Sequence, residues 1–151
     1  GVLGRYAIDF VSVKTAEGWQ HYAIEINLRK GGTTHPFLTL QFLTDGSYDP
    51  KTGLFHTPVG EARYYYASDN LKNADYCRLT PHDLIDIAVS EQLQFHRGTG
   101  QGIAFSLLGA LSEYGKLGMM TIGESPQACR RLYADAVKVL DSASAGVSGN
   151  A

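Results

Sequence analysis

The chain has 151 residues, of which 44% are hydrophobic and 19% charged, and this composition is ordinary for a single globular domain able to bury a core. The formal net charge of −2 argues against a nucleic-acid-binding surface. Because the sequence contains neither a long apolar run nor a signal-peptide pattern, we expect a cytoplasmic protein without a membrane partner.

The first predicted element is a β-hairpin. Residues 7–13 have the pattern of one strand, a turn signal follows at residues 15–19, and residues 22–29 form the second strand. Alternation in the second strand predicts an apolar face made of Tyr22, Ile24, Ile26 and Leu28. The opposite face would then carry Ala23, Glu25, Asn27 and Arg29.

The hairpin brings acidic side chains together. If its loop consists of residues 16–18, Asp9 lies directly opposite Glu25, with Cβ atoms about 4.5–5.5 Å apart. Carboxylates this close repel each other unless a proton or a cation lies between them. Asn27 adds an oxygen on the same face, and such oxygen ligands suit magnesium or manganese. The alternative is that the two carboxylates belong to an ordinary solvated face.

The segment after the hairpin is suited to anions. Arg29 offers a planar donor fork for phosphate or carboxylate, and Gly31-Gly32-Thr33-Thr34 leads to a predicted helix start at Pro36. Free backbone amides at such a start favour an anion. His35 could orient this loop or contact a substrate carboxylate, although a hydrogen bond at the helix start is the plainer role.

The middle of the chain continues with a helix over residues 36–43, stopped by Asp45-Gly46, and an irregular excursion over residues 47–60. A strand then carries three consecutive tyrosines at positions 64–66. They either pack on a sheet or form a stacking surface for an aromatic substrate.

Two further helices are predicted on either side of a second hairpin. Thr80-Pro81-His82-Asp83 opens a helix whose buried stripe is Leu84, Ile87 and Ala88. Residues 102–111 and 117–122 are predicted strands joined by a turn at 112–116. Ser125-Pro126 begins the last helix, whose stripe facing a sheet is Cys129, Leu132, Tyr133, Ala136, Val137 and Leu140.

The cysteines and histidines carry no recognisable site. Cys77 and Cys129 are predicted to be free thiols, since their separation gives no metal spacing. The other histidines also lack a pair at zinc spacing, and we expect surface or structural roles for His21, His56, His82 and His96. No serine or cysteine lies in a nucleophile motif, so covalent enzyme catalysis has little support.

One motif resembles a known family. An acid on one strand, then Glu-x-Asn-x-Arg on the next, a glycine-containing loop and His-Pro resemble the C-terminal lobe of ATP-grasp ligases. The run 24–42, with Thr44-Asp45-Gly46 and Tyr66-Ala67-Ser68-Asp69, looks closest to the carboxylate–amine or peptide ligases of the pheganomycin type. The similarity extends through residues 102–126.

The resemblance implies an α+β fold, a mainly antiparallel sheet with packed helices. We expect a single domain over residues 1–141 and a flexible tail without function over residues 142–151. In this family an N-terminal lobe normally supplies a phosphate-binding lysine and a glycine-rich loop, neither of which is visible here. Because the chain starts at Gly1 without a methionine, we expect a piece of a larger protein.

The resemblance also implies roles for particular residues. Asp9, Glu25 and Asn27 match magnesium ligands that bridge the ATP phosphates, with Arg5 as a second phosphate contact. Arg29 matches a position near the transferred phosphate. Backbone amides of Gly31 and Gly32 would face an oxyanion. The implied substrate contacts are Thr33, Thr34 and His35.

The implied activity is ATP-dependent formation of an amide or peptide bond. With ATP and Mg²⁺ or Mn²⁺, a carboxylate becomes an acyl phosphate that an amine attacks, and the lobe would be active only with its N-terminal partner lobe. The alternative is a non-catalytic metal- or nucleotide-binding lobe, or an isolated interaction domain. An upstream glycine-rich loop with spaced lysines would favour the enzyme. The sequence names neither substrate and leaves homo-oligomerisation open.

Overall fold

The structure is a computed structural model that describes residues 4–146. The described chain divides into two compact units, with the boundary between Leu38 and Thr39. This differs from the single domain expected over residues 1–141. The fold is α+β with antiparallel sheets, as expected. Within the described residues, no helix is both long and apolar enough to cross a membrane.

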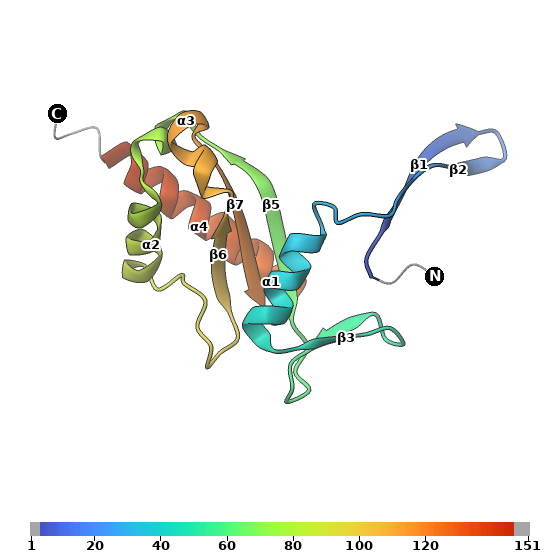
Figure 1. Ribbon diagram of the computed structural model, residues 1–151, viewed down its shortest axis with the longest axis horizontal. Coiled ribbons are helices and arrows are strands. Elements are labelled where there is room, and N and C mark those ends of the chain that lie inside the picture. Colours follow the sequence, from blue (N-terminus) through green and yellow to red (C-terminus); the bar gives the residue numbers. More distant parts are fainter. Residues whose placement is uncertain (1–3, 147–151) are drawn as a thin grey trace. The chain divides into compact units, whose positions relative to one another are not determined.

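The first unit contains an antiparallel hairpin of β1 (Ala7–Thr15) and β2 (Gly18–Asn27), shown in blue in Figure 1. Its turn has two residues between the paired Thr15 and Gly18, where three were expected. The Thr15 hydroxyl donates to the Gly18 carbonyl at 2.9 Å and accepts the Glu17 amide at 3.3 Å. Gly18 has φ +126°, a conformation open to glycine, so it can pair as a strand residue at this tight turn.

A β-bulge resets the register of this hairpin. Phe10 pairs with Ala23, whereas Asp9 pairs with Glu25, so Ile24 is an extra residue on β2. The predicted pairing of Asp9 with Glu25 is therefore confirmed, although the predicted loop was one residue too long. The extra residue in the bulge compensates for the shorter turn.

The bulge also changes which side chains share a face, because residues paired across a ladder point to the same side. Tyr22 pairs with Val11 and lies on the face of Asp9, Glu25 and Asn27, whereas Ala23 lies on the opposite face with Phe10. The sequence had predicted Tyr22 on the apolar face and Ala23 on the face of Glu25, and both assignments were wrong. In addition, β2 ends at Asn27, so Leu28 and Arg29 follow the strand rather than extend it.

Helix α1 (Thr34–Thr44) begins two residues before the expected start at Pro36. The excursion that follows is partly ordered, since β3 (Ser47–Asp49) and β4 (Leu54–His56) form a small antiparallel hairpin where irregular structure was expected. The Asp49 carboxylate accepts the Lys51 amide at 2.9 Å and the Thr52 hydroxyl at 2.9 Å, which closes the turn. Phe55 anchors the hairpin because its side chain is buried.

The second unit is built around a three-stranded antiparallel sheet in the order β5-β7-β6 (Figure 1). Its strands are β5 (Tyr64–Lys72), β6 (Gly102–Ser106) and the central β7 (Lys116–Gly123). The pairing of the last two strands was predicted, but β6 is shorter than the expected 102–111. Leu107 has φ 55°, a left-handed conformation that ends the strand. The short 3-10 helix η2 (Leu108–Ala110) and the one-turn helix α3 (Leu111–Tyr114) follow it.

Two predicted helices are confirmed. In α2 (Pro81–Ser90) the Thr80 side chain and Asp83 form a reciprocal capping box, and Leu84 and Ala88 are buried. Helix α4 (Pro126–Gly146) packs against β5 and β7, and its stripe includes the buried Cys129, Ala136 and Leu140. Residues 142–146 were expected to belong to a flexible tail, but α4 continues through them and Ser144 is fully buried. Residues 147–151 lie outside the described part.

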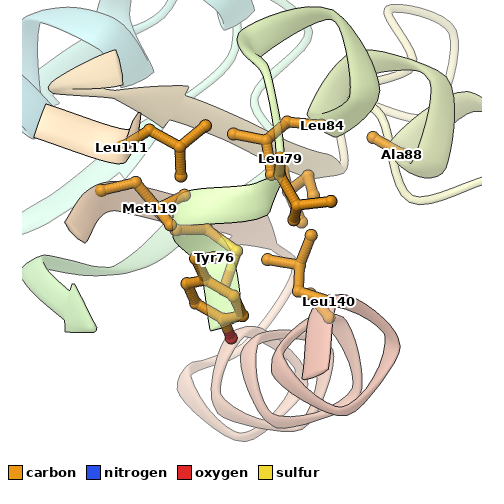
Figure 2. Close-up of a cluster of buried hydrophobic side chains, with 10 residues drawn as sticks. Tyr76, Leu79, Leu84, Ala88, Leu111, Met119 and Leu140 are labelled. Atoms are coloured by element: carbon orange, nitrogen blue, oxygen red, sulfur yellow. The ribbon is translucent and has the colours of Figure 1, made fainter. Parts of the chain in front are cut away.

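The core of the second unit joins both strands and helices, as Figure 2 shows for seven labelled side chains. Tyr76, on η1 (Ala74–Arg78), is fully buried, and its hydroxyl points toward α4. Around it lie Leu79, Leu84, Ala88, Leu111, Met119 and Leu140. This core fixes η1, α2, α3 and α4 around the central strand.

Candidate functional site

The three predicted metal ligands lie together on one face of the first hairpin. Asp9 and Glu25 are directly paired across the ladder. The Asn27 amide Nδ2 donates to Asp9 Oδ2 at 3.0 Å, so Asn27 lies diagonally across from that acid on the same face. Both carboxylates are exposed and Asn27 is half-buried. The hairpin alone thus brings these three polar side chains together.

The donor set fits a hard cation. It consists of two opposed carboxylates and one amide, and oxygen ligands of this kind suit magnesium. Across the described residues, no three side chains of His, Cys, Asp or Glu gather in a way that could hold a metal ion. Any metal here would therefore need Asn27, water or phosphate oxygens to complete its coordination.

The two arginines of the predicted site have different surroundings. Arg29 is exposed in the segment that follows β2. The Arg5 guanidinium carbon lies 4.2 Å from the centroid of the Phe37 ring, a distance at which a cation is attracted to the ring face. Arg5 is thus held beside the first turn of α1.

Thr34 forms hydrogen bonds that close the loop over residues 31–34, here called the glycine loop. The Gly31 amide donates to the Thr34 hydroxyl at 3.1 Å, and the Thr34 amide donates to the Gly31 carbonyl at 2.9 Å. The Gly31 amide is therefore engaged within the loop. A Cβ added at Gly31 or Gly32 would meet no atom within 4 Å, so the loop has open space around it. Thr33 and His35 are exposed, whereas Thr34 is buried.

Two further side chains, which the sequence did not predict, lie on the face of Asp9, Glu25 and Asn27, here called the acidic face. Tyr22 pairs with Val11, and Gln20 pairs with Val13, which continues that face toward the turn. The Tyr22 hydroxyl donates to Gln20 Oε1 at 2.6 Å, in agreement with their common side. Simple alternation cannot find Tyr22, because the bulge at Ile24 interrupts the period of two.

The second unit has a buried polar cluster that the sequence did not suggest. Arg63 is 9% exposed, and its guanidinium donates to the carbonyls of Thr99 at 3.0 Å and Gly100 at 3.2 Å. It also contacts the Glu61 carboxylate at 2.6 Å. These bonds hold the 96–101 loop against the start of β5, which indicates a structural role for Arg63.

An open groove of about 540 Å³ lies between α2 and α4. Its walls contain apolar and polar side chains in similar number, including Ile87, Glu91 and Lys138. None of the predicted site residues lines it. The groove therefore gives no support to the predicted chemistry.

Comparison with known proteins gives two matches. Residues 83–136 match the family model described as the PGM1 C-terminal domain. Over 128 residues the chain is 30% identical to an L-propargylglycine–L-glutamate ligase of Streptantibioticus cattleyicolor, and the match covers 85% of this chain. The matched segment is 26% of that relative, so the chain spans about a quarter of the relative's length. No solved structure matches the chain.

Proposed function

Because the chain resembles the C-terminal lobe of the pheganomycin-type ATP-grasp ligases, we propose that it is one lobe of an ATP-dependent carboxylate–amine ligase. The observation that carries this proposal is the pairing of Asp9 with Glu25, joined by the Asn27 amide at 3.0 Å from Asp9. Two carboxylates that face each other across a ladder are destabilising without a cation, and a bound cation would relieve their repulsion.

Asp9, Glu25 and Asn27 would hold magnesium together with the ATP phosphates. The cation would neutralise phosphate charge during transfer. The exposed Arg29 would oppose the negative charge that develops on the transferred group. Since the Gly31 amide is engaged by Thr34, the Gly32 amide is the better candidate for an oxyanion contact.

The reaction would proceed in two steps. A substrate carboxylate oxygen attacks the γ-phosphorus of ATP, the bond to the β,γ-bridging oxygen breaks, and ADP leaves. An amine then attacks the carbonyl of the acyl phosphate, loses a proton, and expels phosphate to leave an amide. The chain's residues position charges and groups in both steps and supply no covalent nucleophile.

We place substrates among amino acids or short peptides, since the ligase relative is named for joining two amino acids. Activity would require an N-terminal lobe that supplies further phosphate contacts, and we propose a cytoplasmic setting. Thr33 and His35, both exposed beside the glycine loop, would contact a substrate carboxylate.

The test uses a protein in which this chain is joined to its N-terminal lobe. ADP release is measured with ATP, Mg²⁺ and panels of amino acids, with hydroxylamine present to trap an acyl phosphate. We expect acid-dependent ADP release with a hydroxamate product. Glu25→Gln should abolish both, while Glu17→Gln, in the exposed turn of the same hairpin, should change neither.

A second candidate is a non-catalytic metal- or nucleotide-binding lobe, or an interaction domain. It is favoured if the folded protein binds Mg-ATP yet releases no ADP with any acid. Normal ADP release by Glu25→Gln would remove Glu25 from the metal role.

A further inference from the structure

The acidic face of the first hairpin continues into an aromatic and apolar patch. Tyr22 and Val11 form the paired position next to Asp9 and Glu25 on this face, and Gln20 and Val13 form the one after it. Positions two residues apart along a strand are separated by about 7 Å. The face therefore has two parts. The carboxylates of Asp9 and Glu25 lie near the open end of the hairpin, and the Tyr22 ring lies at the next paired position toward the turn.

The Tyr22 ring is available to a ligand. Its hydroxyl is held by Gln20 Oε1 at 2.6 Å, and its side chain is 53% exposed. The hydrogen bond fixes the hydroxyl end of the ring, so the ring can offer a surface without losing further conformational freedom on binding. Its neighbours Val11 and Gln20 offer no carboxylate to a cation, so phosphates bridged by magnesium would lie at Asp9 and Glu25 instead.

This division matches the two chemical parts of a nucleoside triphosphate. We propose that Tyr22 contacts the ribose or base of the ATP whose phosphates lie at Asp9 and Glu25. The inference rests on the proposed function and adds a nucleotide-binding residue that the β-bulge brings to the site. The hairpin turn, rather than the glycine loop, then marks the direction in which the nucleoside extends.

The geometric premise has its own test. In a Cys77→Ser background, cysteine pairs are introduced at Val11 with Tyr22 and at Val11 with Ala23. Paired positions of a ladder lie within disulfide range, whereas Ala23 is on the other face. We expect a disulfide only in the first pair. A disulfide only in the second would show that the bulge is absent and overturn the inference.

The binding test uses the protein with its N-terminal lobe, the non-hydrolysable ATP analogue AMP-PNP, and Mg²⁺. Tyr22→Ala should raise its Kd by roughly fivefold to a hundredfold, as the loss of one stacking contact does. Tyr22→Phe keeps the ring but loses the hydroxyl bond that fixes it, so it should raise the Kd by less than Tyr22→Ala does. Trp19→Ala is the matched control, since Trp19 is 62% exposed on the opposite face of the same hairpin.

The outcomes separate this inference from the proposed function. In turnover assays Tyr22→Ala should raise the KM for ATP and leave the KM for the carboxylate unchanged. An unchanged Kd in Tyr22→Ala, with binding weakened by Glu25→Gln, overturns the role of Tyr22 alone. A rise only in the KM for the carboxylate also overturns it. Absence of AMP-PNP binding by the folded wild-type protein overturns both proposals.

Discussion

The hydroxyl of Tyr76 donates a 2.6 Å hydrogen bond to Asp141 Oδ1 and so ties η1 to α4 across 65 residues of sequence. Asn73 Nδ2 donates to the same oxygen at 2.9 Å. The tyrosine ring is fully buried, so its polar atom depends on this carboxylate for a partner.

We expect Tyr76→Phe to lower the free energy of unfolding by about 1.5–3 kcal/mol, because a hydrogen bond to a charged group is lost while the ring stays in place. Urea denaturation of the chain followed by circular dichroism measures this. Tyr114→Phe is the control, since Tyr114 is 55% exposed. Equal stability of the two variants would contradict a structural role for the Tyr76–Asp141 bond.

Stability should fall in alkaline solution. Burial, and then the Asp141 carboxylate, raise the pKa of Tyr76 above its ordinary value of 10.0. Above pH 10 the unfolded chain therefore binds fewer protons than the folded chain, and the stabilisation present below pH 10 is lost as pH rises. Denaturation series between pH 8 and about 11 should show this decline. The slope should be smaller in Tyr76→Phe, and an identical slope would exclude Tyr76 as its source.

Gly115 should tolerate no side chain. It has φ +57°, and a Cβ added there would overlap the Asn73 carbonyl oxygen. Gly115→Ala should cost about 1–3 kcal/mol in stability, from left-handed backbone strain and displacement of η1. A Cβ added at Gly109 would meet no surrounding atom within 4 Å, so Gly109→Ala should stay within about 0.5 kcal/mol of the wild-type stability. Thermal melts of both variants give the comparison.

The two thiols should differ in reactivity. Cys77 is exposed, whereas Cys129 is buried and its burial raises its pKa, so less thiolate is available for attack. Ellman's reagent at pH 8 should label one thiol rapidly and the second only in denaturant. Cys77→Ser should remove the rapid phase. Rapid labelling that survives this substitution would show that Cys129 is accessible.

The loop held by Arg63 should loosen when the guanidinium is replaced by an ammonium. Arg63→Lys cannot reproduce the separate bonds to the Thr99 and Gly100 carbonyls. Hydrogen exchange should accelerate at residues 96–101. Arg97→Lys is the matched control, because Arg97 is 80% exposed and its pairing with Asp45 is a surface contact. Unchanged protection in Arg63→Lys would refute the role of Arg63.

Features with a local cause could be predicted from the sequence. The cap at Thr80 and Asp83 is encoded within four residues, and the stripe of α4 repeats over its length. The end of β6 was missed because it depends on a positive φ at Leu107, a conformation that leucine rarely adopts. The 47–56 hairpin was missed because turn residues obscure its two short strands.

The candidate site was predictable in composition and less so in geometry. Asp9, Glu25 and Asn27 could be grouped because an antiparallel pair brings acids from both strands together. The position of Tyr22 could not be predicted, since a single extra residue at Ile24 inverts the faces on the turn side. A bulge leaves no distinctive residue pattern here.

The core of the second unit can be completed only after α4 has been synthesised. The sheet strands β5, β6 and β7 are all translated before it, and Cys129, Ala136 and Leu140 complete their core only afterwards. At roughly 5–20 residues per second, the 21 residues of α4 need on the order of seconds to be made. Because α4 packs against β5 and β7, the apolar face of the sheet that it covers stays exposed until α4 docks. A message truncated before Pro126 would yield a product with that surface permanently bare.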